Sequence, residues 1–187
     1  HYTLRDPQVY GISDIPVRYN ATTSDVSAAA DYLQQLTDLD PSCLPLSDQI
    51  TYDILLYLLN QNLSAQNFSL YTEPLGATIG IQAQLPVLLC EYRFENIDDI
   101  HTYLQLLSTT DQYFSSLLSY ERQKAAAGLF MPDSCADDII HQCSTFIEKE
   151  PSLHLLVTVF NRKTGEADFL TESEKKDLMQ QNLDLVT

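Results

Sequence analysis

The clearest pattern in the chain is the recurrence of apolar residues every three or four positions, which predicts helices. Six segments carry it, at about residues 24–36, 47–66, 97–107, 113–127, 134–147 and 171–183. Asn96 and Thr171 are typical helix caps, and Glu174 completes a capping box with Thr171. Leu dominates the apolar residues and only 5 Gly occur, which also favours helices. We therefore predict a mainly α fold, an irregular multi-helix domain with at most one or two short strands.

Three segments fit this pattern less well. Residues 79–85 alternate apolar and polar side chains, which predicts a strand, and Pro86 then suits the first turn of a short helix over 87–92. Residues 152–160 fit a strand and a helix about equally, and we favour the helix. Residues 1–22 lack periodicity and are predicted to form an extended arm laid over the rest. No linker separates these segments, so we predict one helical domain over residues 1–187.

The most apolar predicted helix covers residues 47–66, where Ile54 to Leu59 is an unbroken apolar run. A helix that is apolar on most sides is typically buried. We therefore expect Ser47 to open a buried helix at the centre of the domain. The predicted core consists of Ile54, Leu55, Leu58, Leu59, Leu88, Leu104, Leu107, Phe114, Leu118, Ile140 and Phe146.

The chain is strongly acidic, with a formal net charge of −16 from 26 acidic and 10 basic residues. This charge repels polyanions, so we expect no nucleic-acid partner. No apolar run approaches the roughly 20 residues that span a bilayer, and no basic amphipathic face is evident, so we expect no direct membrane insertion by this chain. The acidity is interpreted as a solubilising surface, with attraction of cationic ligands as the alternative.

Motifs that carry chemistry are missing from the sequence. The four histidines form no HExxH zinc helix, and neither a G-x-S-x-G elbow nor a Gly-rich phosphate loop occurs. The carboxylate pairs Asp98–Asp99 and Asp137–Asp138 fall near predicted helix starts, where the helix dipole favours them; a bound cation is the alternative. We predict that this chain has no catalytic residue, metal site or cofactor of its own. The redox state of Cys43 and Cys90 stays open.

One segment is a candidate for substrate binding. In an extended stretch Gln82 and Gln84 would share one side, and its unpaired edge could hydrogen-bond a peptide backbone. Glu91 and Arg93 follow and could orient a charged terminus. The alternative is that the two glutamines simply face water at a sheet edge.

Five stretches of the chain resemble, in order, the N-terminal part of the bacterial family called domain of unknown function 885. They are Asp6-Pro-Gln-Val-Tyr-Gly-Ile-Ser, Leu70-Tyr-Thr-Glu-Pro-Leu-Gly, Gly80-Ile-Gln-Ala-Gln-Leu-Pro-Val-Leu-Leu-Cys-Glu-Tyr, Ala127-Gly-Leu-Phe-Met-Pro and Asp138-Ile-Ile-His-Gln-Cys. The resemblance implies a mostly helical protein of several hundred residues that is exported or lipid-anchored. It also implies a His-Glu-x-x-Pro-Gly-His stretch in the C-terminal part, typical of a zinc peptidase, and this chain lacks that stretch.

We therefore expect this chain to be the non-catalytic N-terminal helical region of an exported zinc-peptidase-like protein, lining its substrate cleft. Its partners would be the remainder of the parent polypeptide and a peptide substrate, and any zinc would belong to the parent. No stop signal follows the last predicted helix, which ends at about Leu183 near the end of the sequence given, and this favours the interpretation. The alternative is a free-standing helical module that binds other proteins. An extracytoplasmic location is expected, with a cytoplasmic one left open.

Overall fold

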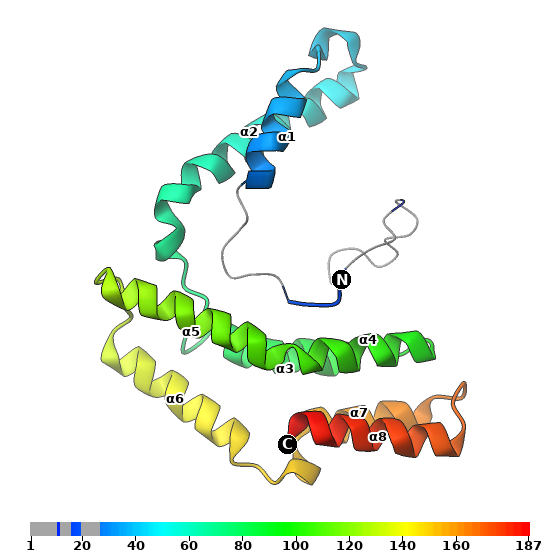
Figure 1. Cartoon of the computed structure of the whole chain (residues 1–187). Helices are drawn as coiled ribbons and strands as arrows, with labels where there is room; N and C mark the ends of the chain where they lie inside the picture. Colours follow the sequence, from blue (N-terminus) through cyan, green and yellow to red (C-terminus); the bar gives the residue numbers. More distant parts are fainter. Residues whose placement is uncertain (1–10, 12–15, 20–26) are drawn as a thin grey trace. The chain divides into compact units, whose positions relative to one another are not determined.

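The computed structural model describes residues 11, 16–19 and 27–187, and this part of the chain is helical without strands (Figure 1). The mainly α prediction is therefore confirmed. The α-helices are α1 (Ser27–Thr37), α2 (Leu46–Ser64), α3 (Ile81–Glu91), α4 (Ile97–Ser108), α5 (Thr110–Ala126), α6 (Asp133–Ile147), α7 (Leu155–Glu166) and α8 (Glu172–Val186). Short 3-10 helices are η2 (Pro41–Cys43), η3 (Ala65–Tyr71) and η4 (Pro151–Leu153). None of the described helices combines the length and the apolar character that a membrane span needs.

The chain folds as two compact units. The core unit comprises His1–Asn20, Glu73–Leu118 and Met131–Thr187, and the hairpin unit comprises Ala21–Thr72 and Ser119–Phe130. Helix α5 begins in the core unit and ends in the hairpin unit. Each unit has its own set of contacts.

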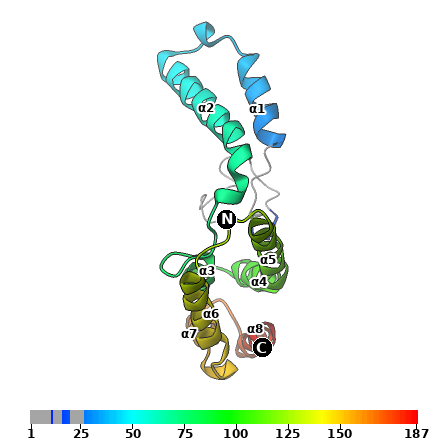
Figure 2. The same cartoon turned by 90° about the vertical axis from the view of Figure 1, so that its left-hand side faces the viewer.

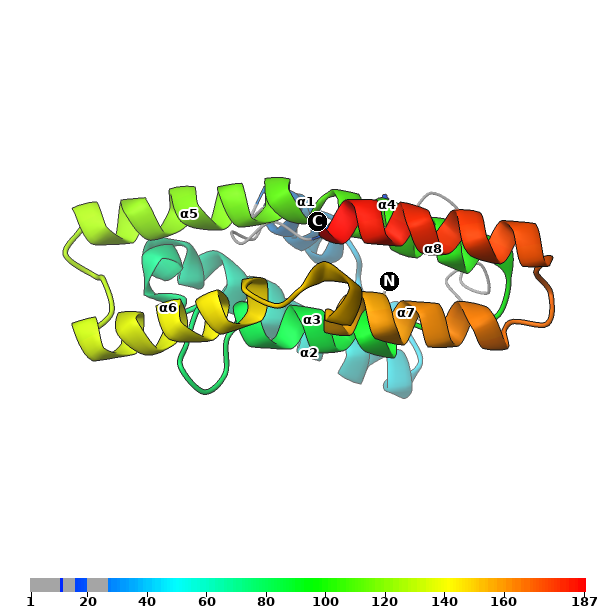
Figure 3. The same ribbon diagram turned by 90° about the horizontal axis from the view of Figure 1, so that it is seen from below.

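The core unit is built on two pairs of helices. Helices α7 and α8 pack side by side, α3 packs on α7, and α4 packs on α8 (Figure 3). The buried cluster between them contains Leu85, Leu89, Ile100, Tyr103, Leu104, Leu106, Leu107, Leu156, Phe160, Ala167, Leu170 and Leu178. Three aromatic rings pack together at this cluster. The centroid of the Phe160 ring lies 5.3 Å from the centroids of both the Phe94 and the Tyr103 rings. The Phe94 ring meets Phe160 edge-on, whereas the Tyr103 ring is tilted by 31° from it, and aromatic contacts of this kind add to the gain from apolar burial.

Helix capping in the core unit follows the sequence closely. Asn96 accepts from the Asp99 backbone N–H, and the Asp99 carboxylate accepts from the Asn96 backbone N–H. Thr171 and Glu174 make the same reciprocal pair at the start of α8. In the hairpin unit, Gly128 adopts a positive φ of 72° just after α5, a conformation that favours glycine. Residues 155–160 lie in α7, so the helix favoured for the ambiguous segment is confirmed.

The predicted core was partly wrong in the core unit. Leu104 and Leu107 are buried as expected, and Phe114 and Phe146 pack against the cluster in half-buried positions. Three other predicted core residues, Leu88, Leu118 and Ile140, are instead 36–62% exposed. In α6 the neighbouring Ile139 is the buried residue, because successive helical side chains point about 100° apart.

The predicted strand over residues 79–85 was also wrong, since α3 begins at Ile81 and contains Pro86. The misleading feature is that apolar residues at 81, 85 and 89 satisfy a period of four as well as a period of two. Leu85 and Leu89 are buried, whereas Ala83, which the alternating pattern grouped with them, is exposed. The predicted short helix over 87–92 is thus the second half of a longer one.

The hairpin unit contains α1 and α2 packed side by side (Figure 2). The helix predicted over 47–66 is confirmed as α2, followed by η3, but its predicted burial was wrong. Ile54, Leu55 and Leu58 are 43–54% exposed, and Leu59 is half-buried. The physical reason is that α1 covers only one side of α2.

The second half of α5 holds the end of η3 in the hairpin unit. The buried Tyr120 hydroxyl donates to the carbonyl oxygens of Ser69, at 2.5 Å, and Thr72, at 3.1 Å. The buried Lys124 ammonium also donates to Thr72, at 3.0 Å, and lies 5.8 Å from the centre of the Tyr120 ring. These side chains satisfy carbonyls that end the η3 segment.

The predicted N-terminal arm and the cap predicted at Thr23 or Ser24 lie largely outside the described residues. Within the described part of the arm, Val17 and Tyr19 pack against the core cluster. The Tyr19 and Thr110 hydroxyls are 3.2 Å apart and hydrogen-bonded. Val17 and Tyr19 therefore lie against the core unit, and the prediction of an extended arm over residues 1–22 stays a prediction.

Burial of Ile100 yields a direct test of this core. Ile100 is fully buried in α4, so Ile100→Ala should lower the free energy of unfolding by about 2–5 kcal/mol. The matched variant Leu58→Ala truncates a half-exposed side chain of α2 and should cost less than about 1 kcal/mol. Urea unfolding followed by circular dichroism measures both. A larger loss for Leu58→Ala would contradict the assignment of the core.

His154 links α6 to α7 and should make stability depend on pH. Its Nδ1 accepts from the Leu156 backbone N–H at 3.4 Å, and its ring lies 4.3 Å from the Phe146 ring. Burial, assisted by the charge of Lys149, lowers the pKa of His154. The unfolded chain therefore takes up a proton first as the pH falls below about 6.5, and folding stability decreases there.

We expect the wild-type chain to lose more stability between pH 8 and pH 5.5 than His154→Asn, which keeps a capping acceptor but does not titrate. Urea unfolding at a series of pH values measures the difference. Parallel pH profiles for the two proteins would contradict the role of His154.

Candidate functional site

Helix α3 is the segment that sequence analysis singled out, and its N-terminal end is tied to α6 through two amides. Gln82 Nε2 donates to the Gly76 carbonyl at 2.7 Å and to Gln142 Oε1 at 3.1 Å. Gln142 Nε2 donates to the Ala77 carbonyl at 2.6 Å. Gly80 permits this turn, because a Cβ there would lie 2.4 Å from the Gly76 backbone nitrogen. Loop 76–80 is thereby fixed against both helices.

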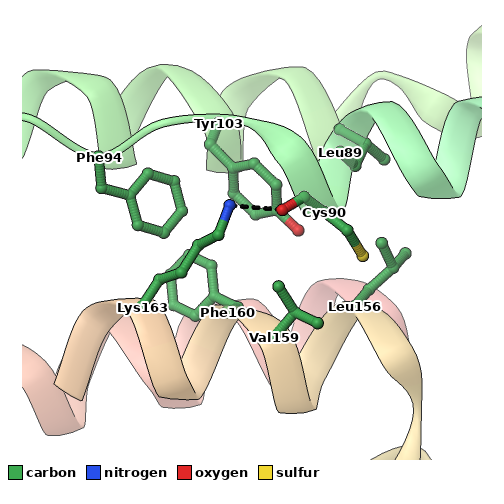
Figure 4. A pocket seen from close by; sticks show the side chains of 8 residues that line it. All are labelled: Leu89, Cys90, Phe94, Tyr103, Leu156, Val159, Phe160 and Lys163. Atoms are coloured by element: carbon green, nitrogen blue, oxygen red, sulfur yellow. Dashed lines mark hydrogen bonds between the residues drawn. The ribbon is translucent and has the colours of Figure 1, made fainter. Parts of the chain in front are cut away.

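The C-terminal end of α3 is held by a lysine from α7. The Lys163 ammonium donates to the carbonyl oxygens of Cys90 and, at 2.7 Å, Tyr92, and it lies 5.6 Å from the centre of the Phe94 ring (Figure 4). A cation suits this position because the last carbonyls of a helix carry a partial negative charge. Burial lowers the pKa of Lys163.

A small depression surrounds this lysine (Figure 4). It is lined by Leu89, Cys90, Phe94, Tyr103, Leu156, Val159, Phe160 and Lys163 and encloses about 160 Å³, solvent at its mouth included. The space enclosed inside it is close to 0 Å³, whereas pockets for small molecules usually enclose about 300–1,000 Å³. We therefore interpret the depression as the seam between α3 and α7, and its residues as the groups that position α3.

The outer face of α3 is the accessible part of the candidate site. Gln84, Val87, Leu88 and Glu91 are exposed at helical spacing, opposite the buried Leu85 and Leu89. This face combines an amide, two apolar side chains and a carboxylate. It can therefore offer hydrogen bonds, apolar contact and one negative charge to a ligand.

The four predicted binding residues have different surroundings. The Gln82 amide donates hydrogen bonds within the chain, to Gly76 and Gln142. Because the segment is a helix and not an extended stretch, Gln82 does not lie on the same side as Gln84. Gln84 and Glu91 lie on the outer face of α3, and the exposed Arg93 follows the end of this helix. The unpaired backbone edge proposed for peptide binding does not exist, because the helix uses its own backbone groups. Any recognition by α3 must come from side chains.

Sequence reasoning missed the two residues that hold α3 in place. Gln142 lies in the Asp138-Ile-Ile-His-Gln-Cys stretch that carries the family resemblance, which was a usable signal. Lys163 gave no signal, because its partners are backbone carbonyls some 70 positions earlier in the chain.

The other candidate chemical groups stay apart. Among the described residues no three His, Cys, Asp or Glu side chains gather in a way that could hold a metal ion. Asp137, Asp138 and His141 are exposed on α6, past its first turn, so capping explains the Asp98–Asp99 pair but not the Asp137–Asp138 pair. Burial raises the pKa of the Cys90 and Cys143 thiols, which disfavours reactive thiolates. We derive no metal-dependent step from these residues.

Replacing Lys163 tests how α3 is held. Lys163→Met keeps the aliphatic stem but removes the donor to two carbonyls, so it should lower the free energy of unfolding by about 1–3 kcal/mol. Lys176→Met, at an exposed position of α8, is the control and should have little effect. Urea unfolding measures both, and equal midpoints would show that the lysine does not hold α3.

Comparison with known proteins gives both a family and a fold. The crystal structure described as "the putative lipoprotein from Colwellia psychrerythraea" matches 86% of this chain with a TM-score of 0.69 and 14% sequence identity. The match covers only 29% of that longer chain, and at this identity it shows the fold alone. No curated protein matches the sequence. The sequence model of the family described as bacterial protein of unknown function (DUF885) matches residues 16–186, and the chain therefore belongs to the DUF885 family.

Proposed function

We propose that this chain is a non-catalytic helical region of a longer DUF885 protein and that the outer face of α3 lines the substrate cleft of that protein. The observation that carries the proposal is the contrast between the two sides of α3. Both ends of the helix are held by Gln82, Gln142 and Lys163, while the side chains of Gln84 and Glu91 are exposed to solvent. A rigid helix with a free, mixed surface can hold a ligand without ordering cost.

The chemistry of this face favours a peptide. The Gln84 amide can both donate to and accept from a peptide backbone, and Val87 and Leu88 offer apolar contact. Glu91 can pair with a cationic group such as an amino terminus, and Arg93, just past the helix, with a carboxylate. In this arrangement side chains of α3 contact the peptide, in place of the unpaired backbone edge expected from the sequence.

The proposal includes an exported parent with zinc-peptidase-like chemistry, as the family resemblance implies. The description of the Colwellia protein as a putative lipoprotein supports an extracytoplasmic location. The zinc and the reacting groups would belong to the part of the parent beyond this chain. Residues of this chain would contribute binding and orientation only.

A free-standing helical module that binds other proteins is the second candidate. The exposed apolar side chains of the hairpin unit favour it, because large apolar surfaces often mark protein contacts. The two candidates differ in what they require: the first needs a longer polypeptide with an activity that α3 affects, and the second does not.

The test uses the longer protein in a peptide-hydrolysis assay. Gln84→Ala and Glu91→Ala should each lower kcat/KM by a factor of about 10 or more, as expected when a hydrogen bond worth about 1–3 kcal/mol is lost. Gln105→Ala, at an exposed position of α4, is the matched control and should leave kcat/KM unchanged. Gln82→Ala should lower stability, because its amide holds loop 76–80. Normal kinetics in the Gln84→Ala, Glu91→Ala double variant would rule out the cleft-lining role.

A further inference from the structure

Helix α2 carries two separate apolar stripes, and only one of them is covered. The inner stripe consists of the half-buried apolar residues Tyr52, Leu56, Leu59 and Leu63, at spacings of three and four, and the half-buried Gln49 precedes them at the same spacing. The outer stripe consists of Leu46, Ile50, Ile54, Tyr57 and Leu58, which are 49–74% exposed. At 3.6 residues per turn the two stripes lie roughly 140° apart around the helix.

Helix α1 accounts for the inner stripe. Its half-buried residues Ala29, Leu33 and Leu36 recur at matching spacing, and α1 packs against α2 along the hairpin (Figure 2). No residue of α2, all of which the structure describes, is buried. The outer stripe thus presents about 18 Å of continuous apolar helix surface.

The α1–α2 segment that carries the outer stripe is acidic and has no cation in its own sequence. Between Arg18 and Arg93 the sequence has no Lys, Arg or His and eight acidic residues. Five of these, Asp31, Asp38, Asp40, Asp48 and Asp53, lie in the segment that forms α1 and α2. Asp53 lies beside the outer stripe, three residues after Ile50 and four before Tyr57. A partner of complementary charge must therefore border its apolar surface with Lys or Arg.

This charge argues against the other occupants of an apolar helix face. A second copy would bring another acidic α1–α2 segment to the contact, so like charges of the two segments would meet there. Anionic lipid headgroups and nucleic acid would be repelled for the same reason. The similar Colwellia chain is more than three times as long as the region matched by this chain, so a longer parent offers ample polypeptide to cover the stripe.

We propose that the outer stripe of α2 is the docking site for an apolar surface bordered by Lys and Arg in the remainder of the longer polypeptide. This inference rests on the proposed function, since it requires that longer polypeptide. It adds a specific contact: the hairpin unit joins the remainder of the protein through Leu46, Ile50, Ile54, Tyr57 and Leu58. Asp53 supplies a charge at the edge of the contact.

Site-specific crosslinking in the longer protein tests the contact directly. A photoreactive phenylalanine analogue at position 54, on the outer stripe, should crosslink to residues beyond Thr187 of the same molecule. The same analogue at position 62, an exposed position on another side of α2, is the control and should not. Mass spectrometry identifies the linked peptides. Crosslinks between two copies, or none from position 54, would overturn the proposal.

Stability measurements give an independent readout. The double variant Ile50→Gln, Ile54→Gln should leave the thermal midpoint of the 187-residue chain unchanged and lower that of the longer protein by about 4 °C or more. Leu56→Gln, on the inner stripe, should lower both midpoints. Asp53→Lys should destabilise only the longer protein, whereas Asp31→Lys, at an exposed position of α1, should not. An unchanged midpoint of the longer protein in the double variant would contradict the docking site.

The two tests separate this inference from the proposed function. Crosslinks from position 54 to the remainder, together with normal kinetics of the α3 variants, would keep the docking site and remove the cleft-lining role. Slower kinetics of the α3 variants, together with no crosslinks from position 54 to the remainder, would keep the cleft-lining role and overturn the docking site. A gene that encodes no residues beyond this chain would overturn both.

Discussion

The core unit depends on one aromatic contact, the packing of Phe160 from α7 against Phe94 and Tyr103. Phe94 lies in the short connection between α3 and α4, and Tyr103 lies on α4, so a single ring joins three elements. Lys163 is one turn further along α7 and therefore reaches the end of α3. The position of α3, and with it the direction of its outer face, follows from how Phe160 is packed.

The helices of this protein could largely be predicted from the sequence because their signals are local. Asn96 and Thr171 each bond to a backbone N–H three residues away, so the whole motif lies within one turn. The α3 segment misled the prediction because spacing of apolar residues at 81, 85 and 89 fits two periods at once. Its anchors, Gln142 and Lys163, are about 60 and 70 positions away from their partners and have no local signal.

Burial was harder to predict than helix formation because it depends on which other helix covers a face. The sequence of α2 is apolar on opposite sides, so the prediction of a helix covered on most sides was a sound one. In the structure α1 covers only the inner stripe, and the predicted core residues Ile54 and Leu58 fall on the other one. The surroundings of the candidate site residues were equally hard to predict. Gln82 and Gln84 are two positions apart, yet Gln82 donates a hydrogen bond within the chain and Gln84 is exposed.

Charge connects the two surfaces that we propose to be functional. The outer stripe of α2 and the outer face of α3 both belong to the stretch between Arg18 and Arg93 that has no Lys, Arg or His. On the outer stripe of α2, a cationic partner group meets Asp53 with no cation near it in the sequence, whereas Glu91 on α3 lies two residues before Arg93. Such attraction is stronger where apolar neighbours exclude water, and both surfaces offer apolar side chains beside the acid. The contact that we propose for the α2 stripe therefore needs a partner that supplies the positive charge, whereas the α3 face offers a carboxylate and, just past the helix, the guanidinium of Arg93.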